Sequence, residues 1–209
     1  MPELIVKKEG STGWIVFSSV KKHNAVTYDM WKAVPGAISE FERDDAIRAI
    51  CITGDGERAF ISGADISEFE QKRSGEEATK EYNRASEAAS DAIAGATKPV
   101  IAKIRGYCFG GGVGIATMCD LRIASDDATF CVPAARLGLG YAYAGIKRLM
   151  DIVGPMYTAE IFATARRFSA AEALQMGYLN KVVPAADLDD YIEGRRAFME
   201  KRKPAFKNR

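Results

Sequence analysis

Two glycine-centred segments contain the residues whose types and spacing point to chemistry. The first, SGAD, spans residues 62–65, and the second, GGGVG, spans residues 110–114. Glycine lets the main chain approach a ligand closely and adopt positive φ angles without steric cost. The second segment lies between two apolar runs, so its first amides are expected at a helix N-terminus, where N–H groups lack intrahelical partners. Free N–H groups of this kind stabilise a negatively charged oxygen.

The glycines alone leave a structural explanation open, because they also permit tight packing of a helix on a strand. The SGAD segment favours the chemical interpretation, since it supplies a second turn of small residues. If amides from both segments face one carbonyl oxygen, they form an oxyanion hole. Removing one donor from such a hole typically costs about 2.7–4 kcal/mol of transition-state stabilisation.

The two segments also carry a resemblance to a known family. Residues 59–69, 98–125, 129–149 and 168–184 resemble the enoyl-CoA hydratase/isomerase family, also called the crotonase family. The resemblance implies that the N–H groups of Ala64 and Gly111 form an oxyanion hole for an acyl-CoA thioester. It also implies a crotonase-like spiral of ββα units and assembly as a homotrimer or a hexamer.

Two positions depart from the pattern of the hydratases in this family. Those enzymes use two glutamates to activate and deliver water, and the resemblance places the corresponding residues at Gly114 and Ala134. Neither residue transfers a proton, and general acid–base catalysis contributes about 10²–10⁴-fold per group. We therefore expect a lyase or isomerase that depends on enolate stabilisation, such as a decarboxylase of a malonyl-type thioester, rather than an efficient hydratase. A non-catalytic acyl-CoA-binding protein is the alternative.

Tyr141 and Arg136 are further candidates. The resemblance places Tyr141 where a methylmalonyl-CoA decarboxylase branch of the family has a functional tyrosine, although an aromatic side chain that only fills space also fits. The forked guanidinium of Arg136 suits a substrate carboxylate. An exposed or structurally paired arginine is the alternative for this position.

The resemblance also implies how the CoA moiety is held. It places backbone groups of Ser62, Ala64 and Ile66 beside the adenine, and we expect Asp65 to order this loop through local hydrogen bonds. Lys22 belongs to a lysine pair near the loop that faces the CoA phosphates. Gly110 completes the predicted substrate-binding set, and no cofactor is expected beyond the CoA moiety of the substrate.

A dinucleotide-binding protein is a competing interpretation, because a strand, a glycine run and a helix also describe a Rossmann turn. The fingerprint G-x-G-x-x-G is incomplete in this chain. If the fingerprint starts at Gly110, its last glycine position is occupied by Ile115; if it starts at Gly112, that position is occupied by Thr117.

The composition limits partners and chemistry. The 209 residues include 29 Lys and Arg and 28 Asp and Glu, and this balance gives no overall field that attracts nucleic acid or an anionic membrane. The single histidine, His23, and four scattered cysteines provide neither a multi-histidine zinc site nor a disulfide framework, so we expect no metal and buried free thiols. No signal-peptide pattern and no apolar run of about 20 residues occurs, which predicts a cytoplasmic protein.

Hydrophobic periodicity predicts strands at 4–7, 14–17, 49–53, 100–104 and 121–124. A helix capped by Thr27 is predicted after the first two strands, and two Ser-x-x-Glu capping boxes predict helix starts near 75 and 170. Strands that alternate with helices predict an α/β fold.

The domain prediction is a crotonase-like core over residues 1–185 and a shortened C-terminal helical segment over residues 186–209. In relatives, roughly fifty residues of helices separate a segment like VVPAADLDD from one like EGRRAFMEKRKPAF. Here the second segment follows the first almost at once. Either an internal deletion joined the two segments near residues 189–191, or the full-length protein contains further residues between them. We expect a deletion to weaken coverage of the substrate site and subunit assembly.

Overall fold

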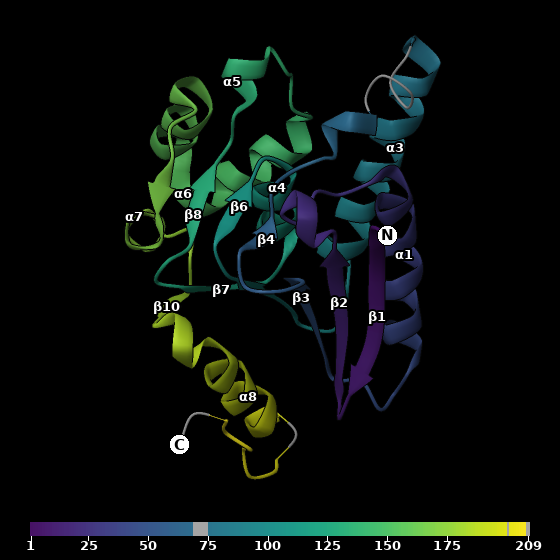
Figure 1. Cartoon of the computed structure of the whole chain (residues 1–209), viewed down its shortest axis with the longest axis vertical. Helices are drawn as coiled ribbons and strands as arrows, with labels where there is room; N and C mark the ends of the chain where they lie inside the picture. Colours follow the sequence, from purple (N-terminus) through teal and green to yellow (C-terminus); the bar gives the residue numbers. More distant parts are fainter. Residues whose placement is uncertain (69–74, 200, 208–209) are drawn as a thin grey trace.

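The computed structural model describes residues 1–68, 75–199 and 201–207. In these residues the chain forms two β-sheets with helices packed around them (Figure 1). The larger, six-stranded sheet has the order β1-β2-β3-β5-β7-β10, and the smaller, four-stranded sheet has the order β4-β6-β8-β9. Strand pairing is parallel except between β1 and β2 and between β8 and β9. The predicted α/β class is confirmed.

The larger sheet contains every strand that the sequence predicts. Its strands are β1 (Glu3–Glu9), β2 (Thr12–Ser18), β3 (Ala49–Gly54), β5 (Val100–Ile104), β7 (Leu121–Ser125) and β10 (Lys181–Val183). The smaller sheet consists of β4 (Ala59–Ile61), β6 (Tyr107–Phe109), β8 (Thr129–Cys131) and β9 (Phe168–Ser169). These strands are too short to show a period of two, so sequence patterning did not predict them.

The helices differ widely in length. The α-helices are α1 (Tyr28–Arg43), α3 (Glu76–Ala94), α4 (Gly111–Met118), α5 (Ala134–Leu137), α6 (Tyr143–Thr164), α7 (Ala170–Gln175) and α8 (Leu188–Met199). Three 3₁₀ turns, η1 (Val20–Lys22), η2 (Ile66–Glu68) and η3 (Ala185–Asp187), complete the described elements.

Two of the three predicted helix starts have the expected caps. The Thr27 hydroxyl accepts the Met30 N–H at 3.3 Å at the start of α1, and Ser169 and Glu172 form a reciprocal capping box at the start of α7. Helix α3 begins at Glu76 with Gly75 as its N-cap, whereas Ser74 lies outside the described residues.

The larger sheet buries a hydrophobic cluster on each face. On the inner face, Ile50, Ile52 and Ala102 pack with residues of α1 and α4. On the outer face, Trp14 and Ile101 pack with α8 in a separate, smaller cluster. Strand residues alternate between the two clusters, as the pleat requires. The shortened C-terminal segment therefore covers the face of the sheet that α4 does not contact, and Figure 1 shows α8 well away from α4 and α5.

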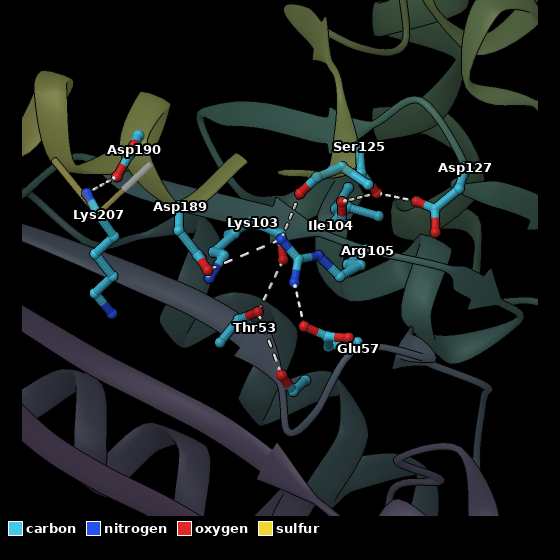
Figure 2. Close-up of polar contacts among 12 residues, drawn as sticks. Thr53, Glu57, Lys103, Ile104, Arg105, Ser125, Asp127, Asp189, Asp190 and Lys207 are labelled. Atoms are coloured by element: carbon cyan, nitrogen blue, oxygen red, sulfur yellow. Dashed lines mark hydrogen bonds and ion pairs between the residues drawn. The ribbon is translucent and has the colours of Figure 1, made fainter. Parts of the chain in front are cut away.

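A polar network ties α8 to the sheet (Figure 2). The Lys103 ammonium on β5 pairs with Asp189 in the first turn of α8, and Arg105 Nη2 donates to the Ala185 carbonyl oxygen at 2.8 Å. Burial opposes ionisation of Asp189, but the hydrogen bond from Lys103 and the positive charges of Lys103, Arg105 and Lys207 together outweigh it and lower the pKa of this carboxyl. A cavity of about 410 Å³ lies beside this network, between the sheet and the C-terminal segment.

The four cysteines, Cys51, Cys108, Cys119 and Cys131, are free and buried, as predicted. Burial raises the pKa of the Cys108 thiol well above its usual value. Among the described residues, no group of three or more His, Cys, Asp or Glu side chains is placed to hold a metal ion. Within the same residues, no helix is both long and apolar enough to cross a membrane.

Candidate active site

The two glycine-centred segments lie side by side because of the smaller sheet. SGAD follows β4, GGGVG follows β6, and these two strands pair in parallel. The carboxyl ends of parallel neighbours meet at one edge of a sheet, so the chain leaves both strands at the same place. The bridge between Val26 and Ala64 ties the SGAD turn to the segment that precedes α1.

The backbone nitrogens of Ala64 and Gly111 are close neighbours. A Cβ atom built onto Gly111 would lie 3.7 Å from the Ala64 nitrogen, and one built onto Gly63 would lie 3.9 Å from the Gly111 nitrogen. Among the described residues, neither the Ala64 nor the Gly111 N–H donates a hydrogen bond to a protein acceptor. Two adjacent N–H groups of this kind can donate together to one ligand oxygen.

The glycine run serves both packing and the candidate site. A Cβ on Gly112 would lie 2.3 Å from the Ile61 carbonyl oxygen, so this position requires glycine for the contact of α4 with β4. Gly110 has a φ of 51°, in the region that favours glycine, and is the N-cap of α4. Packing thus explains the glycine at position 112, whereas Gly110 and Gly111 belong to the candidate anion-binding turn.

Asp65 fixes the turn that presents the Ala64 N–H. Its buried carboxylate accepts hydrogen bonds from Lys22 Nζ at 2.7 Å and from the Ser67 N–H at 3.1 Å, and its own N–H donates to the Val26 carbonyl oxygen at 2.8 Å. Burial raises the pKa of Asp65, but the bonds from Lys22 and Ser67 outweigh it and hold the pKa below its usual value. The Lys22 ammonium also donates to Ser67 Oγ at 2.8 Å, so two of its three N–H groups are engaged.

The other predicted loop residues have different surroundings. The Ser62 hydroxyl donates to the Lys22 carbonyl oxygen at 2.9 Å, and the Ser62 N–H donates to the His23 carbonyl oxygen at 3.1 Å. The side chain of Ile66 is exposed. Exposed His23 has a φ of 52° and packs edge-on against Tyr107.

Two residues that support this loop were not predicted from the sequence. Buried Asn24 donates to the carbonyl oxygens of Asp55 at 2.9 Å and Ala59 at 2.8 Å, while Glu68 accepts the Tyr28 N–H at 2.8 Å at the start of α1. In the sequence, these two residues belong to the polar runs KKHN and ISEFE, and no local pattern distinguishes them from solvent-exposed residues.

The Tyr141 hydroxyl lies beside the glycine turn. It is 3.6 Å from the position of a Cβ on Gly110, and its ring packs edge-on against Phe162 with a centroid separation of 5.1 Å. Burial raises the pKa of Tyr141, which keeps the phenol protonated and able to donate. No hydrogen bond from this hydroxyl is formed within the described part of the chain.

The two positions at which the resemblance predicts glutamates, 114 and 134, differ in the room they offer. A Cβ on Gly114 would meet no atom within 4 Å, whereas Ala134 is buried in the core. Arg136, two residues further along α5, is exposed, and its side chain makes no ion pair with the described residues. The structure therefore brings Ala64, Gly110, Gly111 and Tyr141 together and leaves Arg136 on the surface of α5.

Trp31 of α1 borders the same turn and was not predicted from the sequence. Its Cζ2 atom lies 3.4 Å from the position of a Cβ on Gly111, and its Nε1–H donates to Tyr82 Oη at 3.0 Å. Helical spacing predicts burial but cannot identify which glycine the ring contacts.

Comparisons with known proteins show the family to which this chain belongs. The family model described as enoyl-CoA hydratase/isomerase matches residues 7–193. The short-chain-enoyl-CoA hydratase of Clostridium acetobutylicum is 35% identical over 185 residues, which span 88% of this chain and 70% of the relative. The carnitinyl-CoA dehydratase of Proteus mirabilis is 36% identical over 169 residues, spanning 81% and 64% of the two chains.

Solved structures resemble the whole fold. An enoyl-CoA hydratase/isomerase family protein from Hyphomonas neptunium is 32% identical, with a TM-score of 0.85 and coverage of 100% of this chain and 98% of the other. An enoyl-CoA hydratase/carnithine racemase from Magnetospirillum magneticum is 26% identical, with a TM-score of 0.86 and coverage of 100% and 97%.

Proposed function

Because this chain belongs to the enoyl-CoA hydratase/isomerase family, we propose that it is an enzyme that binds an acyl-CoA thioester and stabilises the enolate of its acyl group. The observation that carries the proposal is the adjacent pair of N–H groups on Ala64 and Gly111, which have no acceptor among the described residues. Negative charge develops on the thioester oxygen when an enolate forms. Fixed amide donors beside that oxygen lower the barrier.

The reaction we propose is a decarboxylation or a proton shift rather than efficient hydration. In a decarboxylation, the bond between the α-carbon and the carboxylate breaks, CO₂ leaves, and the electron pair becomes the enolate. The amides of Ala64 and Gly111 hold the enolate oxygen, and the α-carbon then takes a proton from the Tyr141 hydroxyl or from water. No general base is needed for this sequence, which suits glycine at 114 and alanine at 134.

Binding of the CoA moiety follows from the same loop. Backbone groups of Ser62, Ala64 and Ile66 are proposed to contact the adenine, and the third N–H of the Lys22 ammonium is available for a phosphate oxygen. Arg136 lies on the exposed surface of α5 and is assigned no role in this reaction. Assembly as a homotrimer or hexamer and a cytoplasmic location remain predictions.

A non-catalytic acyl-CoA-binding protein is the second candidate, favoured by the lack of a carboxylate at positions 114 and 134. Turnover of malonyl-CoA distinguishes the two candidates. We expect the purified chain to convert malonyl-CoA to acetyl-CoA, as followed by NMR. Thioester binding without this reaction would support the non-catalytic candidate.

Two comparison substrates complete the experiment. Crotonyl-CoA hydration is expected to stay below the kcat/KM of an efficient enzyme, about 10⁶ M⁻¹s⁻¹. NAD is expected not to bind in calorimetry under the same buffer. Saturable NAD binding with no binding of acetyl-CoA would overturn the proposed function.

A further inference from the structure

Helix α4 begins at the candidate amide pair and ends against a buried arginine. Gly111 is its first residue and Met118 its last, and an α-helix of eight residues spans about 12 Å. At the far end, Arg122 Nη1 donates to the Cys119 carbonyl oxygen at 2.6 Å and to the Ala116 carbonyl oxygen at 3.4 Å. The guanidinium therefore binds the carbonyl end of the helix whose first N–H belongs to the amide pair.

No carboxylate among the described residues neutralises the charge of Arg122. The residue is 6% exposed and forms no ion pair with the described part of the chain. The other contacts of its side chain are with Tyr178, since Nε donates to the Tyr178 carbonyl oxygen at 2.6 Å and Cζ lies 5.5 Å from the centroid of the ring. Burial of an unpaired charge is costly. The carbonyl dipoles at the end of α4 offset this cost, because they attract a cation.

The buried Tyr178 side chain joins the arginine to the start of the helix. Its hydroxyl donates to the Val113 carbonyl oxygen at 3.0 Å, and Val113 lies in the first turn of α4. Thr117 Oγ1 donates to the same oxygen at 2.7 Å. These contacts fix Arg122 relative to α4, so the length of the helix sets the separation between its charge and the amide pair.

A second cation lies at the same end of α4. Arg148 on α6 is half-buried, and its Nε donates to the Thr117 carbonyl oxygen at 3.5 Å. It also forms no ion pair with the described residues. The adjacent acidic residue, Asp120, is exposed, and its carboxylate accepts the Val100 N–H at 2.8 Å. The carbonyl end of α4 is thus contacted by positive side chains, with Arg122 the more buried of the two.

We propose that Arg122 is a positioning residue that strengthens the amide pair electrostatically through α4. The inference rests on the proposed function, because it takes the enolate oxygen to lie at the N–H groups of Ala64 and Gly111. The negative partial charge at the carbonyl end of a helix repels an anion at its other end, and a cation at the carbonyl end cancels this repulsion. At an effective dielectric constant of about 20, a unit charge about 12 Å away stabilises the enolate by an amount equivalent to about tenfold in rate.

The first test is the effect of this charge on the decarboxylation of malonyl-CoA. Arg122→Gln keeps N–H donors but removes the charge, and we expect it to lower kcat about tenfold. KM is expected to change less than about twofold, because the thioester oxygen gains its charge only as CO₂ leaves. Arg122→Lys keeps the charge and is expected to retain most of the wild-type kcat. Arg148→Gln removes a less buried charge from the same end, so a loss of about two- to threefold in kcat is expected.

Arg43→Gln is the matched control, because Arg43 also donates to a carbonyl oxygen near the end of a helix, that of Ser39 in α1 at 3.1 Å. Arg43 is exposed, so solvent screens its charge, and kcat is expected to equal that of the wild-type chain. If Arg122→Gln fails to fold by circular dichroism, Arg148→Gln replaces it in each comparison, and unchanged kcat in that variant overturns the inference.

The carbonyl stretch of bound acetyl-CoA is a readout that a change in fold stability alone does not move. The thioester carbonyl is labelled with ¹³C and followed by infrared difference spectroscopy in the wild-type chain and the variants. We expect the stretch to move to lower frequency on binding to the wild-type chain, because a positive potential at the oxygen polarises the bond. The movement is expected to be smaller in Arg122→Gln and close to that of the wild-type chain in Arg122→Lys and Arg43→Gln.

The outcomes separate this inference from the proposed function. If the wild-type chain neither binds acetyl-CoA nor decarboxylates malonyl-CoA, both are overturned. If acetyl-CoA binds without turnover of malonyl-CoA, the proposed reaction fails and the carbonyl frequencies alone decide the inference. Equal carbonyl frequencies in the wild-type chain and Arg122→Gln, or equal losses of kcat in Arg122→Gln and Arg122→Lys, overturn only the inference. A lower kcat and a smaller carbonyl shift in Arg122→Gln, both restored in Arg122→Lys, support it.

Discussion

Gly111 is the residue at which one added methyl group would change the candidate site most. A Cβ there would press on the Trp31 ring at 3.4 Å and lie 3.7 Å from the Ala64 nitrogen, where a ligand oxygen would otherwise sit. We expect Gly111→Ala to slow malonyl-CoA decarboxylation by about 10²–10³-fold, as much as the loss of one oxyanion donor, because the added methyl group keeps the N–H but displaces the ligand oxygen from it. The rate of acetyl-CoA formation measures this effect.

Gly114→Ala is the control for this change, because its Cβ meets no atom within 4 Å. In a helix interior, alanine is more stable than glycine by about 0.5–1 kcal/mol, so the control is expected to keep its activity and gain slightly in melting temperature. Equal decarboxylation rates in Gly111→Ala and Gly114→Ala would contradict the role of the amide pair.

Asp65 links the stability of the SGAD turn to pH. Because the folded-state pKa of Asp65 is lowered, its ionisation stabilises the fold above the unfolded pKa, and this contribution disappears as the pH falls through the folded value. At pH 7 we expect Asp65→Asn to lower the free energy of unfolding by about 1–3 kcal/mol, the cost of disrupting a buried hydrogen-bonded group. Urea unfolding between pH 7 and pH 3 measures it.

The difference between wild-type and Asp65→Asn is expected to shrink toward the acid end of that series. Asp45→Asn serves as the control, since Asp45 is exposed and its removal leaves the turn intact. A constant difference across the whole series would show that the charge of Asp65 contributes nothing to stability.

At the scale of elements, α8 is the segment whose docking depends on a small number of polar contacts. The pKa of Asp189 is lowered, so its pairing with Lys103 holds α8 at neutral pH and weakens as the pH falls through the folded value. We expect Asp189→Asn to reduce the hydrogen-exchange protection of α8 while leaving β5 and α4 unchanged. Asp187→Asn, an exposed change in the preceding 3₁₀ turn, is expected to leave protection unaltered. Unchanged protection of α8 in Asp189→Asn would exclude this anchoring role.

The elements also show which features can be predicted from sequence. Apolar strands such as β5 and capped helices such as α1 and α7 follow from local patterns, because an apolar run and a side-chain cap are both formed by residues that are neighbours in the sequence. The smaller sheet does not, since its strands have only two or three residues and depend on neighbours distant in the chain. The glycine segments predicted the amide pair, whereas the contact between Trp31 and Tyr82 joins residues 51 positions apart and leaves no local signal.

At the scale of the whole molecule, exposed apolar side chains gather where α5 leads into α6. Leu137, Leu139 and Tyr143 all lie in this stretch and are exposed in the single chain. We expect the wild-type chain, of 22.7 kDa, to sediment as a trimer or hexamer, because contact between copies would remove this apolar area from water. Replacing Leu137 and Leu139 together with glutamate is expected to shift sedimentation toward the monomer.

Arg48→Glu introduces negative charge at an exposed site on another part of the surface and is expected to leave assembly unchanged. A wild-type chain that sediments as a monomer at micromolar concentration would refute the assembly prediction. If the double variant still forms the oligomer, the interface between copies lies outside the α5–α6 stretch.

The amide pair of Ala64 and Gly111 belongs to the main chain, and this has an evolutionary consequence. Side-chain replacements elsewhere in the pocket leave these two N–H groups in place, so under the proposed function the enolate-stabilising donors persist while their neighbours vary. A proton-transferring side chain introduced at position 114, where a Cβ would meet no atom within 4 Å, would not require rebuilding of the anion-binding turn. Under the proposed function, such a scaffold can change the reaction that follows enolate formation while its main-chain amides stay the same. A mutational scan that replaces only side chains would not detect the contribution of these amides.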